Sequence, residues 1–161
     1  MKKRGFLLAE TTIKIIIAVI CIGFLVYFLT SLYLNKVQSE KLEYAKNTLL
    51  GEGNSISNVI RNLETGQTEL YGLQNPKSWY LLSFTKEKKP NSCAGKNCLC
   101  ICAPNVLETA TQECNTDGIC LIIENLLVLE NEQDLEIKIK PIKNIDISRT
   151  ELGITIKEAI N

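Results

Sequence analysis

The sequence contains no histidine, and its 18 Lys and Arg residues balance 18 Asp and Glu residues over 161 positions. Without histidine the chain cannot build Ser-His-Asp or Cys-His catalytic sets, His-ligated metal sites or imidazole proton relays. A net charge of zero argues against a general nucleic-acid-binding protein, which needs a basic excess to displace counterions from phosphates. Phosphate-binding glycine loops, EF-hand spacing and G-x-S-x-G are also missing, so we expect no enzyme and no cofactor.

The charge balance is the sum of two opposite parts. Residues 1–34 carry four basic side chains and one acidic side chain, whereas the rest of the chain carries 14 basic and 17 acidic side chains. Within the first part, residues 15–34 are 20 consecutive uncharged, mostly apolar residues, which span about 30 Å as a helix. This run predicts a single membrane-spanning helix, with a buried core helix of a soluble protein as the alternative. The basic residues before it predict a cytoplasmic N-terminus, which places residues 35–161 outside the cytoplasm.

The residues before the apolar run follow the order of a processing signal. Three basic residues at positions 2–4 precede Gly5 and Phe6, and Glu10 is the fifth residue after Gly5. Residues 1–35 thereby resemble the class III signal of type IV pilins and pseudopilins. The resemblance implies cleavage between Gly5 and Phe6 by a prepilin peptidase, N-methylation of Phe6 in a bacterial-type system, and assembly through the apolar helix.

Glu10 and Lys14 are the charged residues at the membrane end of this helix. A carboxylate near the membrane core costs about 2–3 kcal/mol, so Glu10 requires a partner. In pilins that partner is the amine of a neighbouring subunit's first residue, which would be Phe6 here. The sequence departs from the family pattern at Thr11, Thr12 and Lys14, because family members usually continue with apolar residues. Lys14 stands four residues after Glu10, the favourable order for an intrahelical ion pair, so a plain signal anchor is the alternative.

Beyond the span, a helical pattern gives way to strand patterns. Apolar residues recur at helical spacing over 37–50, Gly51 and Gly53 should interrupt the helix, and Ser55 can cap a second helical run. Alternating and aromatic-rich segments within 79–84, 98–102, 118–130 and 135–156 predict five or six short strands. The predicted fold is therefore α+β, with a long N-terminal transmembrane and amphipathic helix packed on a small antiparallel β-sheet head with disulfides. The predicted parts are a leader (1–5), a transmembrane assembly helix (6–34), a helical stem (35–64) and an extracytoplasmic, cysteine-containing head (65–161).

Six of the seven cysteines lie within 28 positions, in the pattern C-x4-C-x-C-x-C-x11-C-x5-C. An even number outside the cytoplasm favours disulfides. On a strand, Cys98, Cys100 and Cys102 share one face about 7 Å apart, which is too far for bonds among themselves. Their partners must come from Cys93 and from the two cysteines that flank a predicted hairpin turn at 115–118, which are Cys114 and Cys120. Six cysteines allow 15 connectivities, and the sequence does not choose among them.

A metal or iron–sulfur site made from four of these thiolates is the alternative to disulfides. Zinc ribbons and ferredoxins use C-x2-C pairs, because that turn directs two thiolates at one ion. Thioredoxin-like redox sites need C-x-x-C as well. The chain has no such pair, which argues for disulfides and against a metal. The seventh cysteine, Cys21, falls inside the apolar run and is interpreted as a packing residue.

These features favour a structural function over a catalytic one. The first hypothesis is a pilin-like subunit of a type IV filament or pseudopilus at the cell surface. Its partners would be the membrane, a prepilin peptidase and copies of itself or other pilin subunits, with no nucleic acid. The alternatives are a non-polymerising, signal-anchored surface protein with a disulfide-stabilised binding domain, and a membrane-tethered metalloprotein or redox carrier. If the basic leader is removed, the mature chain keeps 15 basic and 18 acidic side chains. The net charge of zero therefore applies only to the precursor.

Overall fold

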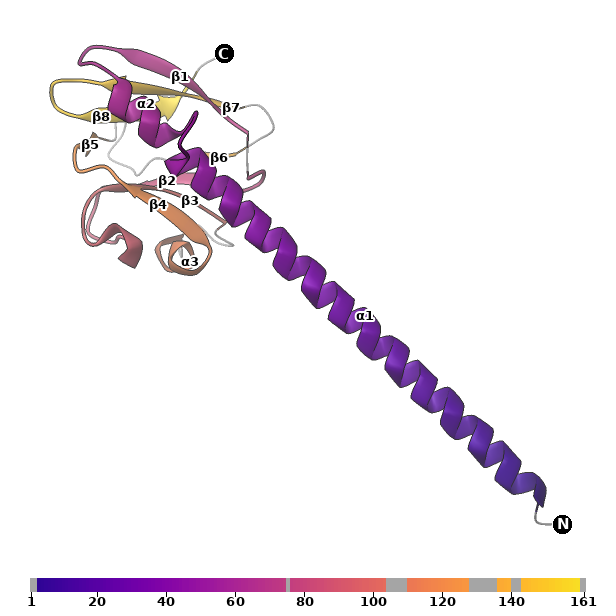
Figure 1. Ribbon diagram of the computed structural model, residues 1–161. Helices are drawn as coiled ribbons and strands as arrows, with labels where there is room; N and C mark the ends of the chain where they lie inside the picture. The colour runs from indigo at the N-terminus through magenta and orange to yellow at the C-terminus, as the bar shows by residue number, and fades with distance from the viewer. Residues whose placement is uncertain (1–2, 75, 104–109, 128–135, 140–142, 160–161) are drawn as a thin grey trace. The chain divides into compact units, whose positions relative to one another are not determined.

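The chain divides into two compact units, Met1–Ser39 and Glu40–Asn161, in the computed structural model. The structure describes residues 3–74, 76–103, 110–127, 136–139 and 143–159, with the backbone alone for residues 3–11 and Glu136. One continuous helix, α1 (Lys3–Leu50), contributes to both units (Figure 1). We call the second unit, residues 40–161, the head.

After α1, the head contains two short α-helices, one 3-10 helix and eight strands among the described residues. In chain order they are α2 (Ile56–Asn62), β1 (Thr68–Leu73), β2 (Tyr80–Phe84), η1 (Asn91–Cys93), β3 (Cys98–Cys102), α3 (Ala110–Thr116), β4 (Gly118–Ile122), β5 (Leu126–Leu127), β6 (Glu136–Lys138), β7 (Lys143–Arg149) and β8 (Ile154–Glu158). The α+β prediction is confirmed. The parts of the predicted strands at 128–135 lie outside the described residues.

The break between α1 and α2 follows from three residues. Gly51 turns so tightly that a Cβ atom there would lie 2.5 Å from the carbonyl oxygen of Asn47. Ser55 is the N-cap of α2, because its hydroxyl accepts a hydrogen bond from the Asn58 amide and donates one to the Gly51 carbonyl. The Asn58 side chain donates further hydrogen bonds to the carbonyls of residues 51–53. The predicted interruption and cap are thus confirmed.

The strands form two four-stranded sheets rather than the single sheet that the sequence predicts. Their orders are β1-β7-β8-β5 and β4-β3-β2-β6, and every pairing is antiparallel except the parallel pair β5–β8. The strand β1, which pairs with β7 over its full length, was not predicted. Only Tyr71 and Leu73 of β1 are buried, so this edge strand carries a weak apolar pattern.

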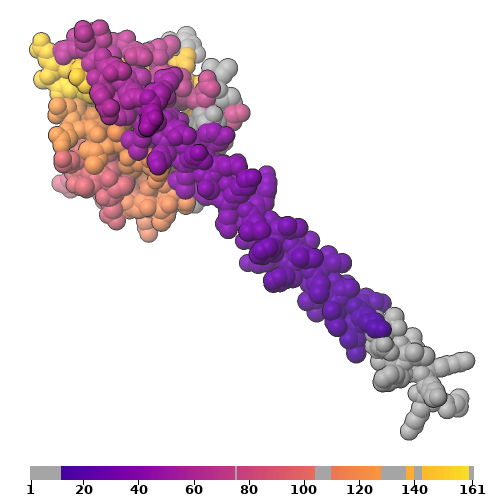
Figure 2. All heavy atoms as spheres, viewed as in Figure 1, coloured from indigo at the N-terminus to yellow at the C-terminus, as the bar shows by residue number. Residues whose placement is uncertain are grey.

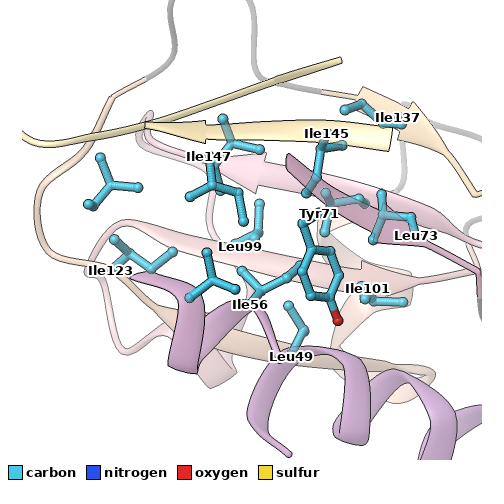
Figure 3. Packing of buried hydrophobic residues seen from close by; sticks show 14 of the residues in the cluster. Leu49, Ile56, Tyr71, Leu73, Leu99, Ile101, Ile123, Ile137, Ile145 and Ile147 are labelled. Carbon is cyan, nitrogen blue, oxygen red and sulfur yellow. The ribbon is translucent and has the colours of Figure 1, made fainter. Parts of the chain in front are cut away.

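The main core lies between the two sheets and the helices (Figure 3). Leu49 of α1 and Ile56 of α2 are fully buried there, beside Tyr71 and Leu99 from the two sheets. Trp79, which directly precedes β2, is 2% exposed and belongs to the same cluster. Burial of these apolar side chains fastens the last turns of α1 to the two sheets.

A second cluster covers the other face of the β4-β3-β2-β6 sheet. All five residues of β3 are buried, because Leu99 and Ile101 face the main core while the three cysteines face the opposite way. Leu82 and Phe84 of β2 pack beside these cysteines, and Ala110 of α3 belongs to the same cluster. The predicted alternation of β3 is therefore confirmed. Because both faces of β3 are covered by apolar clusters, the strand is apolar throughout.

Candidate functional site

The residues of the predicted processing and assembly signal lie at the start of α1. The backbone of Gly5, Phe6 and Glu10 is helical, and the side chains of Phe6 and Glu10 lie outside the described part of the structure. Lys14 is exposed in the same helix, four residues after Glu10. Residues at this separation share a helix face, so an intrahelical Glu10–Lys14 ion pair stays a prediction.

The apolar segment of α1, residues 15–34, is exposed at every residue except Ser31. Within the described chain, one helix is long and apolar enough to cross a membrane, and none of its most apolar stretch is buried. Val19, Phe24 and Tyr27 are between 63% and 73% exposed, and Figure 2 shows the side chains of this segment as spheres around the helix. The Thr30 hydroxyl donates to the Val26 carbonyl at 2.7 Å, which satisfies its hydrogen-bonding group within the helix. So large an apolar surface requires a lipid or protein environment.

The six clustered cysteines form three disulfides in the head: Cys93–Cys98, Cys100–Cys120 and Cys102–Cys114. The prediction of a disulfide-bonded head is confirmed. None of the three bonds joins two cysteines of β3, as the spacing along a strand requires. The cysteines of β3 instead bond to cysteines of three different elements. Cys98 bonds to η1, Cys100 to β4 and Cys102 to α3. The remaining cysteine, Cys21, is free and exposed in α1.

Two of these disulfides lie in contact with each other. The Sγ atom of Cys100 is 3.8 Å from that of Cys93 and 3.9 Å from that of Cys98. The Sγ atoms of Cys93, Cys98, Cys100 and Cys120 all lie within 4.8 Å of one another. We call these four residues the sulfur cluster. Its first three members are completely buried, whereas Cys120 is partly exposed.

Backbone geometry in a short loop brings Cys93 to the cluster. Ala94 and Gly95 have φ angles of 49° and 76°, so the chain reverses direction directly after η1. The Lys89 ammonium group donates to the Gly95 carbonyl and to the Asn97 side chain, which clamps this loop. Spacing along the sequence does not disclose this reversal, because a positive φ at an alanine is uncommon.

The same loop is also tied to the residues that follow β4. Lys96 forms an ion pair with Glu124. The hydrogen bond from Lys96, and then its positive charge, lower the pKa of the Glu124 carboxyl. Both side chains are well exposed, so this pair orders the loop surface and contributes little to stability. The Lys96–Glu124 ion pair therefore has a structural role in the loop.

The predicted hairpin at residues 115–118 is wrong. Residues up to Thr116 form α3, and Gly118 opens β4 without the positive φ expected of a hairpin turn. The glycine is needed for close packing, because a Cβ atom there would lie 2.8 Å from both the Cys102 Cβ atom and the Cys114 carbonyl oxygen. Gly118 thus makes room for the disulfide between these two cysteines.

A polar hollow of about 280 Å³ lies elsewhere on the head. It is open, uncharged and lined by hydroxyl, amide and backbone groups of Tyr44, Asn47, Thr48, Asn54, Tyr71, Gly72 and Gln74. The Tyr71 hydroxyl donates to the Asn54 carbonyl at 3.1 Å, with a longer contact of 3.4 Å to the Thr48 carbonyl. This hydroxyl therefore joins β1 to the segment between α1 and α2, and burial raises the pKa of Tyr71.

The Tyr71→Phe variant should lose about 1 kcal/mol of unfolding free energy at neutral pH, because the carbonyls lose their donor. A raised pKa means that the native state disfavours the phenolate. The wild-type head should therefore lose stability as the pH rises above about 10, and the variant should lack that part of the loss. Guanidinium unfolding followed by Trp79 fluorescence measures both effects. The Tyr44→Phe control concerns a ring that is 52% exposed, and it should behave like the wild type.

No protein-family model, curated protein or solved structure matches the chain. The functional argument therefore depends on the chain's own residues. The structure brings together the six cysteines of the head, and it places Gly5, Phe6, Glu10 and Lys14 in one helix.

Proposed function

We propose that the protein is a pilin-like structural subunit of a type IV filament or pseudopilus. One observation carries the proposal: the Gly5-Phe6 junction and Glu10 begin a helix that continues unbroken to Leu50. The same helix carries an exposed apolar segment near its start and core residues of the head, Ala45 and Leu49, near its end. A subunit that assembles through its helix and displays its head needs both features in one element.

Processing and orientation follow from the charges around Gly5. The three basic residues at positions 2–4 hold the N-terminus in the cytoplasm, and the apolar segment crosses the membrane. A prepilin peptidase cleaves after Gly5, and the new amino group belongs to Phe6. The head then lies outside the cytoplasm, where its three disulfides can form.

Assembly transfers the apolar helix from lipid to a helix bundle. Its exposed Ile, Val, Leu and Phe side chains supply the packing surface. Glu10 pairs with the Phe6 amine of a neighbouring subunit, which sets the axial register between copies. Lys14 lies one helical turn further along the same face. Before assembly, while the subunit is in the membrane, its positive charge can compensate the negative charge of Glu10.

Substitution of Glu10 separates this function from that of a simple membrane anchor. In a host that assembles type IV filaments, Glu10→Ala should reduce incorporation about tenfold or more while leaving membrane insertion intact, because the neighbouring amine loses its charged partner. Lys14→Ala is the matched comparison on the same face: it removes the intrahelical compensation but not the pair between subunits, so it should reduce incorporation less than Glu10→Ala does. The readouts are the amounts of the protein in sheared filaments and in membranes.

Two results would contradict the proposal. Equal incorporation of Glu10→Ala and the wild type would show that no neighbouring amine depends on this carboxylate. A wild-type chain that stays in the membrane fraction of a filament-producing host would instead favour the signal-anchored surface protein.

A further inference from the structure

The sulfur cluster consists of two disulfides that are close enough for all four sulfurs to reach one metal ion once both bonds are reduced. In a zinc site with four cysteine ligands, a Zn–S distance of about 2.3 Å places neighbouring sulfurs about 3.8 Å apart. The contacts between the two disulfides are 3.8 Å and 3.9 Å, and no pair in the cluster exceeds 4.8 Å. The geometry points to a second state of the head, in which Cys93, Cys98, Cys100 and Cys120 are reduced and together bind one thiophilic divalent cation such as Zn²⁺.

Strand pairing holds three of these residues in place independently of their disulfides. Cys98 and Cys100 lie on β3, which is hydrogen-bonded to β2 on one side and to β4 on the other. Cys120 is the residue of β4 directly opposite Cys100. Two ligands from one strand and one from its neighbour therefore converge from the same face of the sheet.

Backbone hydrogen bonds hold the fourth ligand. The Cys93 amide donates to the Pro90 carbonyl at 3.0 Å, and the Cys93 carbonyl accepts from the Lys96 amide at 2.9 Å. The Asn91 amide donates to the side chain of Asn115, which connects η1 to α3. Reduction of the sulfur cluster thus removes two covalent links while these hydrogen bonds still position all four sulfurs.

The site opens on the side of Cys120, its partly exposed member. A dithiol reductant attacks Cys120 there, the Cys100–Cys120 bond breaks, and Cys100 leaves as a thiolate. The second thiol of the reductant then releases Cys120 and closes the reductant into its own disulfide. This first step delivers two electrons to the cluster.

Thiol–disulfide exchange then brings the buried Cys93–Cys98 bond within reach. The Cys100 thiolate, 3.8 Å from Cys93, forms a Cys93–Cys100 bond and releases Cys98 as a thiolate. The Cys120 thiolate next attacks Cys100, which restores the outer Cys100–Cys120 bond and frees Cys93. A second dithiol reduces that outer bond. Two dithiols have supplied four electrons in total, and one Zn²⁺ replaces the protons of the four thiols.

Cobalt(II) serves as the spectroscopic probe for this state. The full-length protein in detergent is reduced with dithiothreitol, freed of reductant under nitrogen and titrated with Co²⁺. We expect one Co²⁺ per chain, with the visible d–d bands and the thiolate-to-metal charge-transfer bands of a tetrahedral sulfur site, and displacement by Zn²⁺. The oxidised protein should show none of these bands.

Two variants test which sulfurs bind the ion. The Cys102→Ala/Cys114→Ala double variant removes the disulfide outside the cluster and should keep the Co²⁺ spectrum. Cys98→Ser should change the spectrum and weaken binding by more than about tenfold, the scale on which even supporting residues act. Trp79 fluorescence reports whether the head stays folded, and metal should restore any native signal lost on reduction.

Three results would overturn the proposal. The first is that neither the reduced wild type nor the double variant shows tetrahedral cobalt bands. The second is that Cys98→Ser leaves the cobalt spectrum unchanged. The third is that the head unfolds on reduction and does not refold when metal is added.

Discussion

Replacing Leu49 by alanine should lower the free energy of unfolding of the head by about 2–5 kcal/mol. Leu49 is completely buried near the C-terminal end of α1, where it contacts the cluster that includes Ile56 and Tyr71 (Figure 3). The truncation removes apolar contacts and leaves a cavity between α1 and the sheets. Alanine is a good helix former, so the loss reports packing rather than helix propensity.

The neighbouring residue supplies a matched control. Leu50 is 43% exposed, and Leu50→Ala should cost less than about 1 kcal/mol. Guanidinium unfolding of the full-length protein in detergent, followed through the buried Trp79, measures both variants. Equal losses for the two substitutions would contradict the role of Leu49 in joining α1 to the sheets of the head.

Removing the Cys100–Cys120 disulfide should cost roughly 3 kcal/mol of stability. The bond joins residues 20 positions apart, and because Cys102–Cys114 already closes 12 of these positions, the loss comes from the smaller loop that remains. The Cys100→Ala/Cys120→Ala double variant is preferable to serine, because a serine hydroxyl at position 100 would be fully buried. The same unfolding experiment under non-reducing conditions gives the loss.

Cys21→Ala is the control for this experiment. Cys21 is exposed in α1 and belongs to no disulfide, so its replacement should leave the stability of the head unchanged within about 0.5 kcal/mol. A double variant at positions 100 and 120 that is as stable as Cys21→Ala would contradict the stabilising role of this disulfide.

Features that depend on local patterns could be predicted from the sequence. The uncharged run at 15–34, the glycines at 51 and 53 and the capping residue Ser55 each act within a few neighbouring positions, and the helices follow them. The alternation of cysteines in β3 likewise placed them on one face, which the disulfides confirm. Periodicity and capping are strong signals because they arise from backbone geometry alone.

Features that depend on distant contacts could not be predicted. Whether the strands form one sheet or two depends on which layers cover the faces of β3, and β3 is apolar on both. The hairpin expected at 115–118 is replaced by α3, because Gly118 serves close packing against Cys102 and Cys114 rather than a turn. Both errors arise where tertiary packing overrides a local residue preference.

The cysteine spacing shows the same limit for the candidate site. The lack of C-x2-C argued against a metal, since that motif directs two thiolates to one ion through a tight turn. In the folded head, β3–β4 pairing and the reversal at Ala94 and Gly95 bring four sulfurs together by another route. Spacing along the chain cannot reveal a cluster of sulfurs that is assembled by sheet register.

The mass of the mature N-terminus tests the proposed function most directly. The protein is purified from the membranes of a host that has a prepilin peptidase, and its N-terminal peptide is identified by mass spectrometry. The pilin-like function predicts a chain that begins at Phe6, with a methylated amine in a bacterial-type system. A chain that begins at Met1 or Lys2 would contradict it, because the basic leader would then be part of a permanent membrane anchor.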